Sequence, residues 1–159
     1  MSRATKLAVT AVIAAAAVAV PASPAMAWTA GPVSAALSGP MIIDAGIPAS
    51  CTSATYGGSI TAAGDLTITS ATAECGVAIT PSQLPWSGSL TGGVATISGY
   101  RVSGMGCTYG GSLVGSYVSE DESFPVTVTF TEQTVSRVSG HFLCPSSATI
   151  TASYVFTQP

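Results

Sequence analysis

A single histidine, His141, is the only side chain that titrates near neutral pH without a perturbed pKa. A catalytic triad around it could take its acid from Asp44, Asp65 or Glu74 and its nucleophile from many serines. The chain lacks a Gly-x-Ser-x-Gly motif, and abundant serine makes a Ser–His proximity weak support for catalysis. We therefore predict no catalytic residue, no enzyme activity, and a strand position for His141 in Ser139-Gly140-His141-Phe142.

Carboxylates gather once, in Glu120-Asp121-Glu122. Two facing carboxylates could hydrolyse a glycoside, but consecutive residues project in different directions. Calcium binding is the alternative, although no EF-hand or Asp-rich repeat surrounds the cluster. We predict a solvated hairpin tip, with no metal site and no cofactor.

Four cysteines, Cys51, Cys75, Cys107 and Cys144, all follow an N-terminal secretory signal. Residues 1–27 combine Arg3 and Lys6 with an apolar run and an Ala-x-Ala cleavage pattern, so residues 28–159 form one exported domain. No Cys-x-x-Cys motif is present, which disfavours zinc. An even number of cysteines in an exported chain predicts two disulfides, with three possible pairings.

Charge and composition narrow the partners of residues 28–159. Two arginines against seven carboxylates give 2 − 7 = −5, and no lysine remains after the signal. Nucleic acid is excluded as a partner and an anionic membrane surface is disfavoured, because both need several cations. No transmembrane helix is expected in this part of the chain. The ligand, extracellular or in the cell envelope, and the oligomeric state stay open.

Alternation of apolar and hydroxyl residues predicts the fold. It is clearest in residues 148–156, where every second side chain is apolar, and turn residues separate such runs at 44–46, 63–65 and 91–93. We predict an all-β sandwich or closed barrel of about nine to eleven short antiparallel strands. Most of the alternating runs are shorter than the span that a membrane strand needs.

One internal repeat suggests two related halves. Thr55-Tyr56-Gly57-Gly58-Ser59-Ile60 recurs as Thr108-Tyr109-Gly110-Gly111-Ser112-Leu113, and each copy has one cysteine before it and one after it. This arrangement favours the pairs Cys51–Cys75 and Cys107–Cys144.

Aromatic side chains offer the best candidates for a binding surface. Tyr109, Tyr117 and Tyr154 occupy inward positions of the alternation, which leaves Trp28 and Trp86 as possible exposed rings. Trp86 lies within the least strand-like segment, 81–88, which could alternatively anchor to the core or form a rigid inhibitory loop.

A resemblance accompanies these patterns. Cys51, Cys75, Pro85-Trp86, Gly106-Cys107-Thr108-Tyr109 and Cys144 resemble the pattern of a group of small uncharacterised exported proteins of actinobacteria. The resemblance implies export and a β fold, and it supplies no site residues.

The sequence therefore predicts a secreted, disulfide-stabilised, non-catalytic β domain, either extracellular or loosely associated with the cell envelope, that acts in recognition. Two alternatives remain: a self-associating surface or pore-forming envelope protein, and a small secreted enzyme or protease inhibitor.

Overall fold

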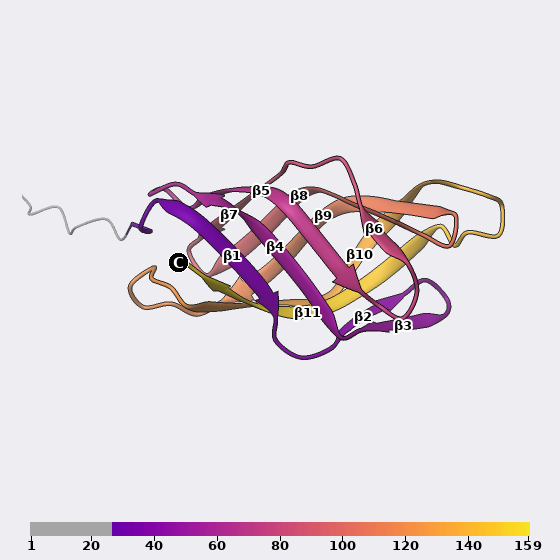
Figure 1. Ribbon diagram of the computed structural model, residues 1–159, viewed down its shortest axis with the longest axis horizontal. Coiled ribbons are helices and arrows are strands. Elements are labelled where there is room, and N and C mark those ends of the chain that lie inside the picture. The colour runs from indigo at the N-terminus through magenta and orange to yellow at the C-terminus, as the bar shows by residue number, and fades with distance from the viewer. Residues whose placement is uncertain (1–26) are drawn as a thin grey trace, which may run out of the picture.

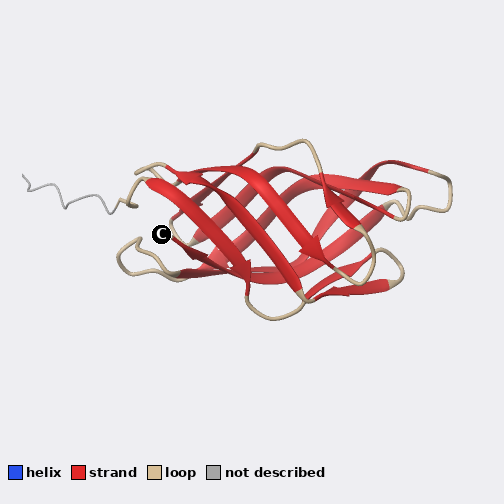
Figure 2. Cartoon of the chain, in the orientation of Figure 1, coloured by secondary structure: helices blue, strands red, loops and turns tan. Residues whose placement is uncertain are grey.

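The computed structural model describes residues 27–159, which form β-strands and connecting loops (Figure 1). The predicted signal peptide lies, apart from Ala27, outside the described residues. Figure 2 shows that the described part of the chain is strand and loop throughout. This part contains no helix that could cross a membrane.

Eight of the strands close into a barrel. In ring order these are β1 (Gly31–Leu37), β4 (Ser53–Ile60), β5 (Asp65–Glu74), β7 (Trp86–Thr91), β8 (Val94–Gly104), β9 (Cys107–Tyr117), β10 (Val126–Gly140) and β11 (Ser147–Thr157). All neighbouring pairs are antiparallel, and β11 pairs with β1 to complete the ring. The prediction of an all-β fold is confirmed, and of the two architectures it allowed, the chain adopts the closed barrel.

Three further strands lie outside the ring. Strands β2 (Met41–Asp44) and β3 (Pro48–Cys51) form a hairpin that continues the sheet from β11. Strand β6 (Ile79–Pro81) pairs with β8. The total of eleven strands lies within the predicted range. Several strands are longer than expected, because β10 has 15 residues and β8, β9 and β11 have 11 each.

Side chains alternate between a filled interior and a hydroxyl-rich exterior. On β11 the inward residues are those predicted from the alternation, namely Ala148, Ile150, Ala152, Tyr154 and Phe156, and all are buried. The outward positions of the same strand are mostly Ser and Thr.

Large aromatic side chains fill the centre of the barrel. Tyr56 stacks on Tyr154 at a ring-centroid distance of 4.6 Å, and Trp86 lies 5.0 Å from Tyr100. The cavity among these rings measures about 10 Å³. That volume is at the lower limit for one water molecule, so this part of the interior has no room for an organic ligand.

The two copies of the sequence repeat occupy β4 and β9, which stand four positions apart in the ring of eight strands. In both copies Tyr faces inward, at Tyr56 and Tyr109, and so does the final apolar residue. Register shifts also occur beside both glycine pairs, between β4 and β5 and between β8 and β9. The copies therefore occupy corresponding positions in the ring and turn the same residue types inward, and each half of the ring contributes four strands.

The second glycine of each copy allows a matched test of backbone packing. A Cβ on Gly58 would lie 1.9 Å from the carbonyl oxygen of Thr67, whereas a Cβ on Gly111 would lie 3.7 Å from its nearest neighbour, Val135. Gly58→Ala should lower the free energy of unfolding by about 1–3 kcal/mol. Gly111→Ala should change it by less than about 1 kcal/mol. Urea unfolding of both variants checks this, and equal losses would contradict it.

The buried tyrosines predict a loss of stability in alkali. Burial raises the pKa of Tyr154 to about 12, and burial together with neighbouring tyrosines raises the pKa of Tyr56 and Tyr100 above the usual 10.0. Unfolded tyrosines ionise near pH 10, so the unfolded state releases these protons first. The contribution of these tyrosines to stability should be constant below about pH 10, and stability should then fall by about 1.4 kcal/mol per pH unit per buried tyrosine.

Urea unfolding between about pH 8 and pH 11 measures this loss. Ultraviolet absorbance of tyrosinate in the folded protein is the control. Early ionisation of all five tyrosines without unfolding would contradict the assignment of buried rings.

Candidate functional site

Trp28 and Trp86, proposed above as exposed rings, are at most 2% exposed. The indole nitrogen of Trp28 donates to the carbonyl oxygen of Leu90, and that of Trp86 donates to the carbonyl oxygen of Ser82, each at 2.9 Å. A large apolar ring gains more from the barrel interior than from water, and each N–H has a partner there. The expected exposure of these rings is therefore corrected, and neither offers a binding surface in this structure.

The segment 81–88 is also more regular than expected. Pro81 ends β6 and Trp86 begins β7, so that only residues 82–85 form a loop. The Trp86 ring anchors this loop to the core, which is the alternative that the sequence left open.

His141 lies in the loop after β10, not on a strand. Its side chain is exposed, and its Nδ1 accepts a hydrogen bond from the Leu143 amide at 3.2 Å. The ligand atoms of His141, Cys107 and Cys144 lie within 4.8 Å of one another. The two sulfurs are bonded to each other, which removes the thiolates that a soft metal would need.

The acidic cluster Glu120-Asp121-Glu122 lies in the loop between β9 and β10, as predicted for a hairpin tip. Asp65, at the start of β5, lies at the same end of the barrel. The turn before it and Tyr117, which ends β9 just before the acidic loop, both form backbone hydrogen bonds with the β7–β8 hairpin. Four of the seven carboxylates therefore collect at this end.

Both predicted disulfides are present, Cys51–Cys75 and Cys107–Cys144. Cys51 and Cys107 precede the two equivalent strands β4 and β9, or begin them. Strands four positions apart in an antiparallel ring run in the same direction, so both disulfides lie at the end opposite the acidic loop.

The loop 141–146 at the disulfide end is held in place at several points. Cys144 is bonded to Cys107, the guanidinium of Arg137 donates to the Cys144 carbonyl oxygen, and the Cys144 amide donates to the His141 carbonyl at 3.0 Å. The Tyr109 hydroxyl donates to the carbonyl oxygen of Pro145 at 3.3 Å. Strands β9 and β10 thus fix the loop, and Arg137 bonds to a carbonyl oxygen within it.

Three loop tips meet at this end and expose large apolar side chains. A Cβ on Gly46 in the β2–β3 turn would contact Pro145, and one on Gly106 in the β8–β9 turn would contact His141. Figure 1 shows the β2–β3 hairpin and the β10–β11 loop at the end away from the C-terminus. The exposed fractions lie between 71% and 89% for four side chains, which we call the loop-tip patch: Ile47, Met105, Phe142 and Leu143.

A family model described as "Alkane oxidation protein activator PraA/PraB-like" matches residues 1–158. The chain belongs to the PraA/PraB-like family. No match was found among curated proteins or among solved structures. The description names an activator protein and does not name an enzyme.

Sequence reasoning did not single out the loop-tip patch of this PraA/PraB-like chain. Phe142 was assigned to a strand with His141, and Ile47 and Met105 are isolated apolar residues within turns. The tripeptide His141-Phe142-Leu143, between Gly140 and Cys144, could have indicated this patch. Two large apolar residues in a short turn next to a disulfide cannot easily reach the core.

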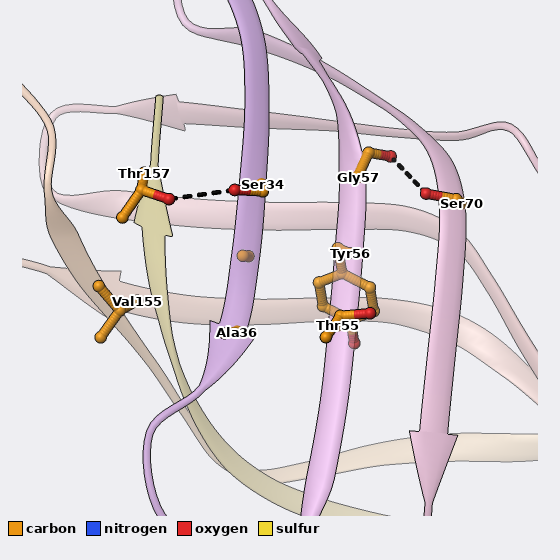
Figure 3. Close-up of a pocket in the computed structure, with 9 residues that line it drawn as sticks. Ser34, Ala36, Thr55, Tyr56, Gly57, Ser70, Val155 and Thr157 are labelled. Atoms are coloured by element: carbon orange, nitrogen blue, oxygen red, sulfur yellow. Dashed lines mark hydrogen bonds between the residues drawn. The ribbon is translucent and has the colours of Figure 1, made fainter. Parts of the chain in front are cut away.

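A second surface feature is a hollow of about 420 Å³ on the outer face of the barrel (Figure 3). Small residues leave the space, among them Ala36 and Gly57. The surrounding hydroxyls bond to one another, as in Ser34–Thr157 at 3.0 Å and Thr55–Thr72 at 2.7 Å. Because these groups satisfy one another, the hollow presents fewer free polar atoms to a ligand than its composition suggests.

The two disulfides should stabilise the chain similarly and protect different segments. The sequence separations of 24 and 37 residues predict losses of up to about 3.5 and 4 kcal/mol in Cys51→Ser/Cys75→Ser and Cys107→Ser/Cys144→Ser. Only the second double variant frees the loop 141–146. Limited proteolysis with an aromatic-specific protease should therefore cut at Phe142 faster in that variant, with the first as control. Equal cutting in both would contradict the tethering.

Proposed function

We propose that the chain is an exported, non-catalytic accessory protein for alkane oxidation that acts through its surface. The filled barrel interior carries the proposal. The cavity of about 10 Å³ among the central aromatic rings cannot enclose an alkane, so this is not a carrier with an internal binding site. The PraA/PraB-like family description supplies the process that the protein would assist.

Export is part of the proposal and rests on three observations. The N-terminal residues have the pattern of a signal peptide, and both disulfides would be stable in an oxidising compartment. The outer surface is built mainly from Ser and Thr with few charges. Release into the medium or loose association with the envelope both agree with these features. An actinobacterial source, suggested by the cysteine and Pro85-Trp86 pattern, also belongs to the proposal.

The alternatives receive less support. A pore in a lipid layer would need apolar side chains outward, whereas this barrel turns its apolar side chains inward. An inhibitor of proteases would need a protruding rigid loop in the segment 81–88, and the Trp86 ring holds that segment against the core. A triad at His141 lacks its expected setting, because the imidazole Nδ1 accepts a backbone hydrogen bond in the loop.

Growth of the producing organism on alkane tests the proposal. A strain that lacks the protein should grow more slowly on a liquid alkane and normally on a soluble carbon source. Exported protein purified from the wild type and added to the medium should restore the rate, because the proposed action is extracellular. Equal growth of both strains on alkane would contradict the proposal. Oxidised alkane formed by the purified protein alone would contradict the non-catalytic role.

A further inference from the structure

The loop-tip patch is the most exposed group of large apolar side chains that lies at one end of the described barrel. Its members come from the β2–β3 turn, the β8–β9 turn and the loop 141–146. Val77 and Val138, both partly exposed, lie on segments next to these loops. Exposed apolar side chains that cluster in this way mark an interaction site more often than scattered ones do.

The exposure of Phe142 and Leu143 is imposed by the fold. The disulfide, the Arg137 and Tyr109 hydrogen bonds and the 141–144 turn fix the backbone on both sides of these residues. A loose loop could turn such side chains inward, where burial would stabilise them. This loop is tied at its base, so the two side chains are held in water until something covers them.

The form of the patch favours a liquid apolar phase as its occupant. Each of the four side chains is at least 71% exposed and therefore stands largely free of its neighbours. A protein partner would need a separate socket for each of them. A liquid hydrocarbon surface adapts its shape and can surround each side chain without a preformed socket.

Charge further restricts the occupant. Arg101, Arg137, Asp44 and Glu74 lie in the half of the barrel near the patch, Glu132 lies near the middle of β10, and the other four carboxylates lie at the opposite end. No lysine lies among the described residues, and Arg137 is bonded within the loop. An anionic phospholipid surface would attract such a molecule weakly, because each basic residue near it contributes to binding. An uncharged hydrocarbon surface needs no cations.

We propose that the loop-tip patch inserts into the surface of a liquid alkane, so that the protein docks end-on with the acidic β9–β10 loop in water. The choice of alkane rests on the proposed function, and the site and its orientation rest on the structure. No bond forms or breaks in this step.

Adsorption to dispersed hexadecane droplets tests the site, with the purified exported protein and two variants. Phe142→Ser/Leu143→Ser removes half of the patch. Val118→Ser is the matched control, because Val118 is 90% exposed on the acidic loop at the other end. The double variant should need roughly tenfold or more droplet surface for the same depletion from water. Val118→Ser should adsorb like the wild type.

Near-ultraviolet circular dichroism and the urea midpoint should be unchanged in all variants, since the substituted side chains are exposed. If a double variant with unchanged folding adsorbs like the wild type, or if Val118→Ser loses as much, the proposed site is wrong. Met105→Ser is an independent patch variant, and it should weaken adsorption in the same direction as the double variant.

Two further measurements distinguish a liquid alkane from a phospholipid membrane and from a second copy of the protein. Vesicles of zwitterionic and of anionic phospholipid should bind the wild type more weakly than hexadecane droplets at equal surface area. Tighter binding to either vesicle would overturn the choice of alkane. Sedimentation should show no dimer that the double variant dissociates, and such a dimer would assign the patch to a second copy. Loss of growth support with normal adsorption would contradict the proposed function and leave the docking site intact.

Discussion

The pairing of β1 with β11 is the constraint on which the structure depends. It joins Ser34 to Thr157 and Leu37 to Tyr154, and it converts an open sheet into a ring. Closure removes two sheet edges that could pair with another chain. It also fixes the inner volume, which the inward side chains must then fill without gaps.

Filling that volume with aromatic side chains restricts where the protein can act. Tyr56, Trp86, Tyr100 and Tyr154 pack against one another in the centre, and only about 10 Å³ is left among them. A ligand therefore has no room among these central rings, and the outer face and the ends of the barrel are the surfaces that it can contact. The outer face is largely occupied by hydroxyls that bond across strands, such as Ser89–Thr96 and Thr129–Ser153. The two ends differ from this face, because one end carries an acidic loop and the other carries exposed apolar side chains.

Much of the fold could be predicted from the sequence because alternation is a local signal. The inward set on β11, the turns at 44–46 and 91–93 and the cysteine pairs all follow from residues close in the chain or from the repeat. Closure could not be predicted, since the β1–β11 contact joins residues more than a hundred positions apart and has no sequence mark of its own. The same limit applies to Trp28, whose partners Leu90 and Tyr117 are also far away in the chain.

The candidate site was missed for a related reason. His141 is a candidate because its residue type alone indicates possible chemistry. Phe142 and Leu143 become candidates only because the fold keeps their side chains exposed. Their exposure depends on Cys144, Arg137 and Tyr109, which the sequence presents separately as a disulfide partner, one of two cations and a core ring. A site made by holding apolar residues outward cannot be recognised from residue types alone.

Comparison of the two halves of the barrel shows which loop creates the loop-tip patch. Both disulfides close the same end, yet Cys75 is followed by a short link to β6, whereas Cys144 lies inside a loop that carries two large apolar residues. Since equivalent strands β4 and β9 support both disulfides, the difference lies in the loop after β10 and not in the framework. At the other end, Trp28 packs on Phe124 and Tyr117 beneath the acidic loop, so the large aromatic side chains are covered there, although Val118 is exposed. The two ends of the barrel therefore differ, because one carries the acidic loop and the other carries the disulfides and the loop-tip patch. Docking at a boundary between water and an apolar phase requires such a difference.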